Sequence, residues 1–195
     1  MGSLGGGSMR DYEEYYRTQM EDGALFQDFV VDVAWQAGLV IAQYASKTYQ
    51  FSVGESRSGV EIKHDKQRKS TGNLYVEYAE KRRPRPGPYA PAGIMRNDHW
   101  LFAVGDYDVV YFFANNLLRG LFAASKADGS PKYRRVQSRT SQGFLLPEDD
   151  GAKYAALVLR PDAAGKVEQR ITDLEGLARS LHVVMLENPK QLTLF

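Results

Sequence analysis

The sequence predicts a single α/β domain in which a long N-terminal helix packs on a central mixed β-sheet. Its 195 residues are enough for one hydrophobic core. Residues 24–45 carry apolar side chains at helical spacing, and three short segments of β-type composition follow at 48–53, 59–65 and 73–79. Strands and helices are mixed in the rest of the chain, and this order of elements favours a mixed sheet covered by helices.

The first expected element is a long and mostly buried helix over residues 24–45. Its apolar positions share the spacing of one helix face: Phe26, Val30, Val33, Ala37, Val40, Ile41 and Tyr44. Gly38 is the weakest helical position within it. Residues 9–20 show a weaker helical pattern, which Asp22 and Gly23 are expected to interrupt.

The three β-type segments that follow are expected to form an antiparallel meander, because polar and Gly-containing stretches separate them. Residues 82–91 contain four prolines, which predict an extended surface loop.

The second half of the chain begins with two expected strands, residues 100–104 and 109–114, on either side of a turn. Asn115 is expected to cap a helix over residues 116–125. The remaining expectations are a loop, a strand, a helix and a short apolar segment at residues 128–139, 154–159, 172–181 and 182–186.

Composition excludes several classes of protein. The chain is 43% hydrophobic and 25% charged, which argues against a disordered chain or a coiled-coil rod. It has no cysteine, which excludes a disulfide scaffold, a thiol nucleophile and a thiolate metal site. No apolar stretch approaches the roughly 18 residues of a spanning helix, and no signal pattern is present, so a cytoplasmic protein without membrane contact is expected.

The chain divides into three parts by composition. Residues 1–8, with the sequence MGSLGGGS, are typical of an added tag or linker before a second Met9. Residues 9–186 are expected to form the single domain, and residues 187–195 a C-terminal tail.

Basic side chains are unevenly distributed, although 25 Lys and Arg nearly balance 24 Asp and Glu. They gather at residues 63–69, 81–85 and 132–139, and a shared face would bind the phosphates of DNA. The candidate DNA-binding residues are Lys66, Arg68, Lys69, Arg82, Arg83, Arg85, Arg134 and Arg135. The alternative is that each cluster is an ordinary solvated loop. Tyr89 and Trp100 are candidates for contacts with bases.

The most informative segment is residues 54–63, with the sequence GESRSGVEIK, followed by Asp65. Because side chains alternate along a strand, Glu61, Lys63 and Asp65 are expected on one face, opposite the apolar Val60 and Ile62. Glu55 lies at the preceding turn, where a bend can bring it beside Glu61.

Paired carboxylates with a lysine suit metal-dependent phosphodiester hydrolysis. Mg²⁺ prefers oxygen ligands and is commonly held by one or two carboxylates, and Mn²⁺ accepts the same ligands. A neighbouring lysine can orient the attacking water and offset charge in the transition state. The alternative is an exposed strand with an ordinary alternation of Glu and Lys.

The constellation of helix, acid at a turn, Gly-Val-Glu-Ile-Lys strand and a further strand bearing Glu77 resembles the PD-(D/E)xK nuclease superfamily. Within it, the mismatch-repair nicking enzymes and type II restriction endonucleases are the most similar. The resemblance covers residues 22–82 and implies a restriction-endonuclease-like core. It also implies that Glu55 and Glu61 are metal ligands and that Lys63 is the catalytic lysine.

The chain departs from the family pattern at two positions, with Gly54 where proline is common and Glu55 where aspartate is usual. An alternative register makes Glu61 the first acid and places Glu77 in the second motif. Otherwise Glu77 is an auxiliary catalytic carboxylate or a strand-surface residue. Members often add an acid from the preceding helix, for which Asp28 and Asp32 are candidates, unless both belong to its polar face.

The histidines and the common sequence motifs argue against other chemistries. His64, His99 and His182 lack the spacing of metal ligands, so a histidine–metal nuclease is not expected. Phosphate-loop, dinucleotide-binding and nucleophile-elbow motifs are absent from the sequence, which disfavours an NTPase, a dinucleotide-dependent enzyme and a serine hydrolase.

The C-terminal residues 191–195, with the sequence QLTLF, follow a Pro-Lys tether. They resemble the motif by which bacterial replication and repair proteins bind the DNA sliding clamp. The resemblance implies that Gln191 enters a polar site and that Leu192, Leu194 and Phe195 provide apolar anchors. The alternative is a terminal apolar strand packed on the protein's own sheet.

These features together predict a Mg²⁺-dependent DNA endonuclease of bacterial or phage origin, recruited to DNA by the sliding clamp, with a role in DNA repair. Two alternatives remain open. One is a catalytically inert DNA-binding adaptor on a nuclease-like scaffold, and the other is a dimeric junction resolvase. The sequence does not determine the oligomeric state.

Overall fold

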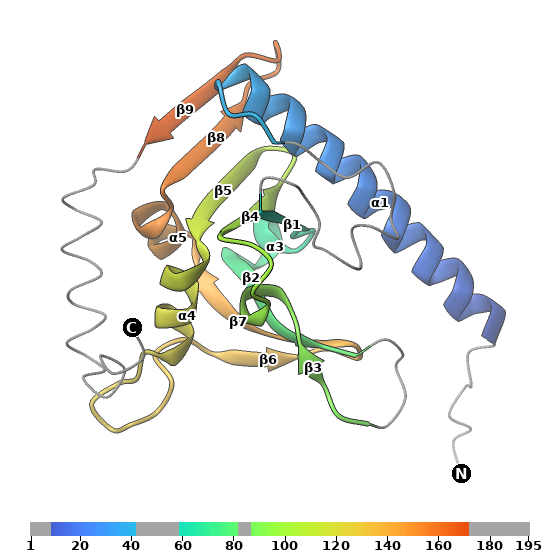
Figure 1. Ribbon diagram of the computed structural model, residues 1–195, viewed down its shortest axis with the longest axis vertical. Coiled ribbons are helices and arrows are strands. Elements are labelled where there is room, and N and C mark those ends of the chain that lie inside the picture. Colours follow the sequence, from blue (N-terminus) through green and yellow to red (C-terminus); the bar gives the residue numbers. More distant parts are fainter. Residues whose placement is uncertain (1–8, 42–58, 82–86, 172–195) are drawn as a thin grey trace.

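The computed structural model describes residues 9–41, 59–81 and 87–171, which form two β-sheets with helices around them (Figure 1). The expected strand at 48–53 lies outside the described residues, as do Glu55, Arg82, Arg83 and Arg85. The clamp-binding residues Gln191, Leu192, Leu194 and Phe195 lie outside them as well.

The first sheet has five strands in the spatial order β1-β4-β5-β8-β9. Its strands are β1 (Val60–His64), β4 (Leu101–Asp106), β5 (Val109–Ala114), β8 (Leu157–Pro161) and β9 (Val167–Ile171). The edge strand β1 pairs parallel with β4, and every other pair is antiparallel, so this sheet is mixed as expected.

The second sheet has four antiparallel strands in the spatial order β3-β2-β7-β6. Its strands are β3 (Ala90–Pro91), β2 (Asn73–Glu80), β7 (Ser141–Pro147) and β6 (Arg135–Gln137). The short helical elements are α3 (Arg68–Thr71), η1 (Gly93–Met95), α4 (Asn115–Ala123) and α5 (Glu148–Tyr154).

Helix α1 (Met9–Gln36) is longer at its start than expected and shorter at its end. It continues through Asp22 and Gly23, so the expected interruption there is wrong. It ends at Gln36, and the φ of 80° at Gly38 lets Leu39 N–H donate to Ala34 O (2.8 Å) and Gly38 N–H to Trp35 O (2.9 Å) just after it. No helix within the described residues is long and apolar enough to cross a membrane.

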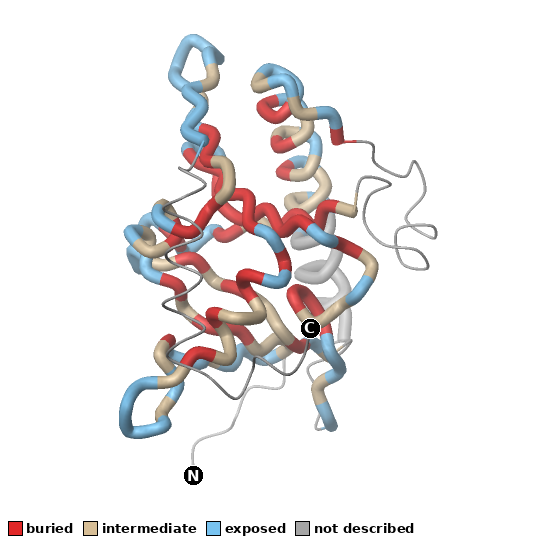
Figure 2. The backbone as a smooth tube through the Cα atoms, turned by 60° about the vertical axis from the view of Figure 1, so that its left-hand side comes forward, coloured by how far each residue is buried: buried red, intermediate tan, exposed pale blue. Residues whose placement is uncertain are grey.

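The core has two halves, one on each face of the first sheet. On one face, α1 packs Phe26, Val30 and Val33 against alternate residues of β1, β4 and β5. On the other face, the intervening residues of β4 and β5 pack against α4 and the second sheet. Because both faces are covered, β4 and β5 are almost continuously apolar. Figure 2 shows buried positions running through the middle of the molecule and exposed positions at its outer loops.

The expected meander is wrong for the part of it that the structure describes. Strands β1 and β2 follow each other in sequence, but they belong to different sheets. The partner of β1 is β4, and the partners of β2 are β3 and β7. Composition marks each strand, but it does not encode which distant strand completes the pairing.

Several local expectations also differ from the structure. Asn115 does not cap α4, because its side-chain amide donates to Ile94 O (3.2 Å) and His99 O (3.5 Å). Residues 128–139 contain strand β6, and Tyr154 ends helix α5 rather than beginning a strand. The strands β7 and β9 lacked a clear alternating pattern and were not expected.

A buried arginine ties the first sheet to α5. The guanidinium of Arg68 donates to both carboxylate oxygens of Asp106 (2.9 and 3.2 Å) and to Glu148 (2.6 Å). Tyr111 O–H also donates to Glu148 (2.7 Å). The expected role of Arg68 in binding DNA phosphates is therefore wrong, because its donors are used inside the protein.

Replacing Asp106 with Asn is expected to lower the free energy of unfolding by about 3 kcal/mol at pH 7. This is the lower end of the cost of breaking a buried ion pair, since Glu148 still contacts Arg68. Burial opposes ionisation of Asp106, but Arg68 holds its pKa below the ordinary value of 3.8. The stabilisation is thus complete above about pH 4 and is lost as the pH falls through the folded-state pKa.

Urea unfolding of the wild type and Asp106→Asn between pH 7 and pH 3 measures this difference. The exposed Asp149→Asn on α5 is the matched control and should leave the unfolding free energy unchanged. Equal stability of Asp106→Asn and the wild type at pH 7 would contradict the prediction.

Candidate metal and catalytic site

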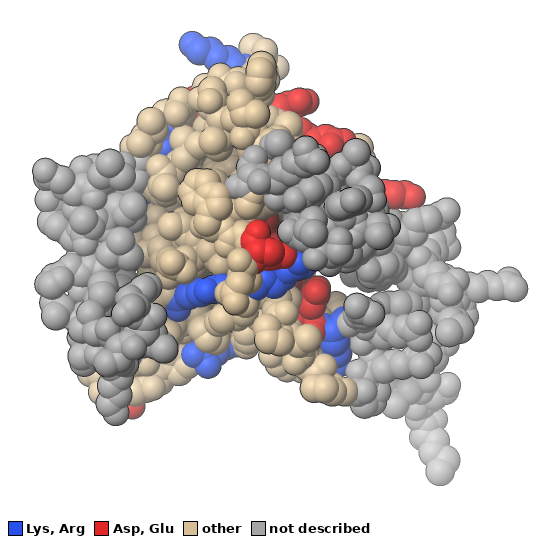
Figure 3. All heavy atoms as spheres, in the orientation of Figure 1, with Lys and Arg blue, Asp and Glu red and all other residues tan. Residues whose placement is uncertain are grey.

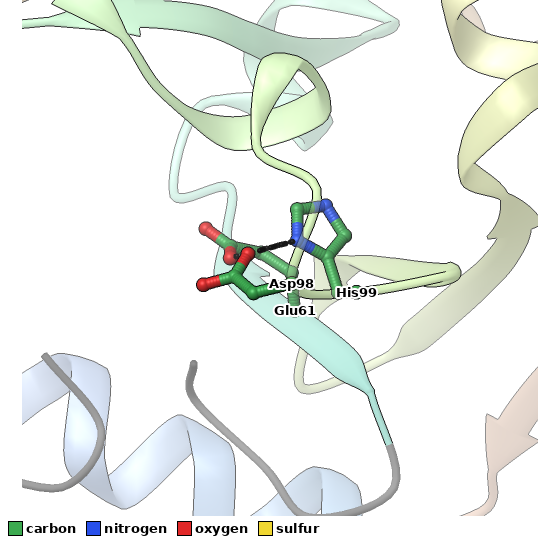
Figure 4. A group of neighbouring side chains, drawn as sticks. All are labelled: Glu61, Asp98 and His99. Carbon is green, nitrogen blue, oxygen red and sulfur yellow. Dashed lines mark hydrogen bonds and ion pairs between the residues drawn. The ribbon is translucent and has the colours of Figure 1, made fainter. Parts of the chain in front are cut away.

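The candidate site lies at the edge strand β1, where the first sheet meets β2 of the second sheet and the segment leading into β4. Val60 and Ile62 lie on the face of β1 opposite Glu61 and Lys63, as expected. The structure adds that Val60 and Ile62 face α1 and that Glu61 and Lys63 face the second sheet. Parallel pairing of Val60 with Leu101 brings the residues before β4 beside the start of β1. Asp98 and His99 thereby reach Glu61 (Figure 4).

Glu61, Asp98 and His99 form a group that could hold a metal ion. Their ligand atoms all lie within 4.8 Å of one another. His99 Nδ1 lies 3.1 Å from Asp98 Oδ1 and 3.6 Å from Glu61 Oε2. The side chains of Glu61 and His99 are only 2% and 3% exposed, so the group is largely shielded from water.

Lys63 links this group to the second sheet. Its Nζ lies 2.8 Å from Glu61 Oε1 and 3.4 Å from Glu77 Oε1. Burial opposes ionisation of Glu61, but the charge and hydrogen bond of Lys63 lower the pKa of Glu61 below its ordinary value. Glu61 is therefore ionised at neutral pH, as a metal ligand must be.

Glu77 is placed by an irregularity in β2. The β2–β7 register shifts between Glu77 and Ala79, so that Tyr78 is an extra, bulged residue. The η1 turn packs closely on this point, since a Cβ at Gly93 would lie 2.2 Å from Glu77 O. Burial raises the pKa of Glu77, and the charge of Lys63 only partly offsets this effect.

Two arginines hold the segment that carries Asp98. Arg119 of α4 donates to Ile94 O and Arg96 O, both at 2.6 Å, and to Asn97 Oδ1 at 3.0 Å. Arg96 forms an ion pair with Asp98. Burial opposes ionisation of Asp98, but Arg96 and His99 hold its pKa below the ordinary value. Both carboxylates of the group are thus ionised and fixed in position.

The group fits a divalent cation by its chemistry. Two ionised carboxylates and one imidazole are common ligands of first-row metals. His99 Nδ1 now hydrogen-bonds Asp98, and an ion would take the place of the shared proton. The structure therefore supports a metal-binding group, and it does not identify the metal.

No family model, curated protein or solved structure matches this chain. The resemblance to PD-(D/E)xK nucleases and to clamp-binding tails therefore stays a prediction. What the structure provides independently is the mixed sheet with helices and the grouping of Glu61 with Lys63, Glu77, Asp98 and His99.

The structure places the other expected acids away from this group. Asp28 and Asp32 are exposed on α1, and neither makes an ion pair or hydrogen bond within the described residues. Asp65 is buried just after β1, where its carboxylate accepts from Gln67 N–H (3.0 Å) and Tyr75 N–H (2.7 Å). It therefore stabilises the connection between β1 and β2.

The sequence reasoning missed Asp98 and His99. His99 was set aside because no second histidine stood at ligand spacing, but its partners are carboxylates from distant positions. The available signal was the Asp-His pair just before the strand beginning at Leu101. That signal becomes informative only when this strand is known to pair parallel with β1.

The expected DNA-binding residues within the described chain have different environments. Lys66 pairs with Asp22, and Lys69 pairs with Asp108. Arg134 and Arg135 are exposed, and Arg135 also lies over the Phe122 ring at 4.3 Å. Figure 3 shows Lys and Arg side chains gathered in a band across one face, with acidic side chains beside it.

Proposed function

We propose that this protein is a metal-dependent DNA endonuclease whose ion is held by Glu61, Asp98 and His99. The observation that carries the proposal is the buried, ionised Glu61, which contacts a lysine through one oxygen and lies near an imidazole through the other. A buried carboxylate with a lysine and further ligands is suited to hydrolysis of a phosphodiester.

The donor set favours Mn²⁺ over the Mg²⁺ expected from sequence. Mg²⁺ strongly prefers oxygen ligands and retains several waters, whereas Mn²⁺ accepts an imidazole more readily. Mg²⁺ remains the second candidate. A bound ion would act as a Lewis acid and lower the pKa of water.

The protein's own side chains have distinct proposed roles. Lys63 Nζ would stabilise negative charge developing on the phosphate and keep Glu61 ionised. Glu77, with its raised pKa, would accept a proton from the attacking water at Oε1. Within the described chain that oxygen has no hydrogen-bond partner and lies 3.4 Å from Lys63 Nζ.

DNA is the proposed substrate because exposed basic side chains are suited to contact backbone phosphates. The residues that would contact backbone phosphates are the exposed Lys66, Lys69, Arg134 and Arg135. Arg82, Arg83 and Arg85 lie outside the described residues and stay predicted phosphate contacts.

Cleavage of supercoiled plasmid in Mn²⁺, Mg²⁺, Zn²⁺ or EDTA tests the proposal. We expect cleavage in Mn²⁺, weaker cleavage in Mg²⁺ and none in EDTA. DNA binding without cleavage in any metal would contradict an enzyme and support the inert adaptor. Paired cuts restricted to four-way junctions would instead support the junction resolvase.

The C-terminal tail gives a separate prediction about recruitment. A peptide of residues 188–195 is expected to bind a bacterial sliding clamp, and deletion of 191–195 should abolish clamp binding without slowing cleavage of free DNA. Tethering would raise the local concentration of enzyme at DNA and leave the chemistry unchanged. Calorimetry with the purified clamp measures this, and a full-length protein that does not bind would refute recruitment.

A further inference from the structure

A pocket of about 370 Å³ lies next to the candidate metal site and shares His99 with it. Its lining comes from the segment before β4 and from the first turns of α4, and includes Asn97, His99, Trp100, Asn115, Asn116 and Arg119. Figure 4 shows the far edge of the His99 ring turned away from both carboxylates. The pocket is thus a second feature, which the metal group does not explain.

The pocket is lined mainly by polar side chains and by the planar indole ring of Trp100. Asn115 offers a side-chain oxygen without a hydrogen-bond partner, Asn97 offers an amide group that can donate, and Arg119 offers donors. No carboxylate is among the described residues that line the pocket. Trp100 is 64% exposed, which is unusual for a residue of this size. An indole face beside amide groups is the combination that proteins use to stack and read an unpaired base.

We propose that this pocket binds a nucleobase of the DNA strand next to the cleaved phosphate. His99 belongs both to the pocket and to the metal group, so a base bound in the pocket would lie close to the metal ion. That this base neighbours the cleaved phosphate rests on the proposed function. The base would stack on Trp100, and the asparagine amides and Arg119 would contact its polar edge.

The groups that would hold the base are fixed in position. The backbone N–H of Trp100 donates to Gly59 O (2.9 Å), and the indole Cδ1 lies 2.7 Å from where a Cβ at residue 59 would be. The ring therefore packs across a glycine two residues before Glu61. Arg119 is held through Nε and Nη2, and within the described chain its Nη1 has no hydrogen-bond partner.

A base fits the pocket better than a phosphate group does. A phosphate needs donors alone, whereas Asn115 carries a buried side-chain oxygen without a hydrogen-bond partner. An acceptor of this kind suits the exocyclic amino group of a base. The exposed indole likewise offers little to a phosphate but a stacking surface to a base.

Tryptophan fluorescence provides a direct test, because the chain has two tryptophans and Trp35→Phe leaves Trp100 as the single reporter. The variant is titrated in EDTA with dAMP, deoxyribose 5-phosphate and inorganic phosphate. We expect saturable quenching by dAMP, with affinity roughly tenfold or more above that of the sugar phosphate. Equal affinity for all three would mean a phosphate pocket and would overturn the proposal.

A matched pair of variants gives an independent readout. Trp100→Leu is expected to weaken binding of a labelled single-stranded oligonucleotide about tenfold, measured by fluorescence anisotropy in EDTA. Trp35→Leu, at a position on α1 that is 67% exposed, should bind as the wild type does. Unchanged binding by Trp100→Leu would overturn the pocket.

The two proposals fail in distinguishable ways. Metal-dependent cleavage combined with equal affinity for dAMP and deoxyribose 5-phosphate would retain the nuclease and remove the base pocket. Base-dependent quenching of Trp100 in a protein that cleaves in no metal would retain the pocket and remove the nuclease.

Discussion

Replacing Glu61 with Gln is expected to abolish DNA cleavage and to weaken binding of Mn²⁺ by at least about 100-fold. Even partners outside a metal's ligands typically change affinity 10- to 100-fold, and Glu61 is proposed as a ligand itself. Gln keeps the size of the side chain at a position that is 2% exposed, so the change removes charge rather than volume. Calorimetric titration with Mn²⁺ and plasmid cleavage are the two measurements.

Two further variants make this result interpretable. Asp98→Asn removes a second carboxylate whose side chain is 25% exposed, so it tests the metal group with less risk to folding. Glu80→Gln, exposed on β2, is the control and should bind Mn²⁺ normally. Wild-type metal affinity in both Glu61→Gln and Asp98→Asn would remove the metal assignment.

Replacing Lys63 with Met is expected to slow cleavage roughly 10²- to 10³-fold, the usual cost of losing one group that stabilises the transition state. It should also move metal binding to higher pH. Burial raises the pKa of Glu61 and Lys63 is the main group that lowers it, so without Lys63 the carboxylate ionises at higher pH.

Manganese titrations of Lys63→Met between pH 5 and pH 8 separate these effects. Restored metal affinity at high pH with cleavage still slow would show that Lys63 contributes to the chemistry beyond keeping Glu61 ionised. Lys153→Met, exposed on α5, is the matched control. Full cleavage activity in Lys63→Met would remove this residue from the mechanism.

Local sequence patterns predicted several elements of the fold correctly. The strand at 109–114 has the expected bounds, and the alternation of Val60 and Ile62 with Glu61 and Lys63 has the expected faces. Helical spacing also identified the buried side of α1 at Phe26, Val30 and Val33. These features depend on neighbours within one turn or one strand, which a single sequence contains.

The same patterns could not predict which strands pair with each other in the two sheets. Nothing in the composition of β1 indicates that it pairs parallel with β4, or that β2 belongs to another sheet. The burial of Arg68 could not be predicted for the same reason. A basic residue in a polar segment is expected to be exposed, and only the structure shows its ion pairs with Asp106 and Glu148.

By itself, the sequence determined that this chain is an α/β protein with Glu61 and Lys63 on the polar face of a strand, because periodicity and composition are local properties. The sequence left Glu77 either as an auxiliary carboxylate or as a strand-surface residue, and only the tertiary structure decided that it lies beside Lys63 and that Asp98 and His99 join the group. That grouping requires β1 to lie at a sheet edge, parallel to β4 and facing the second sheet. Such contacts are set by the packing of whole sheets, and no spacing along the chain records them.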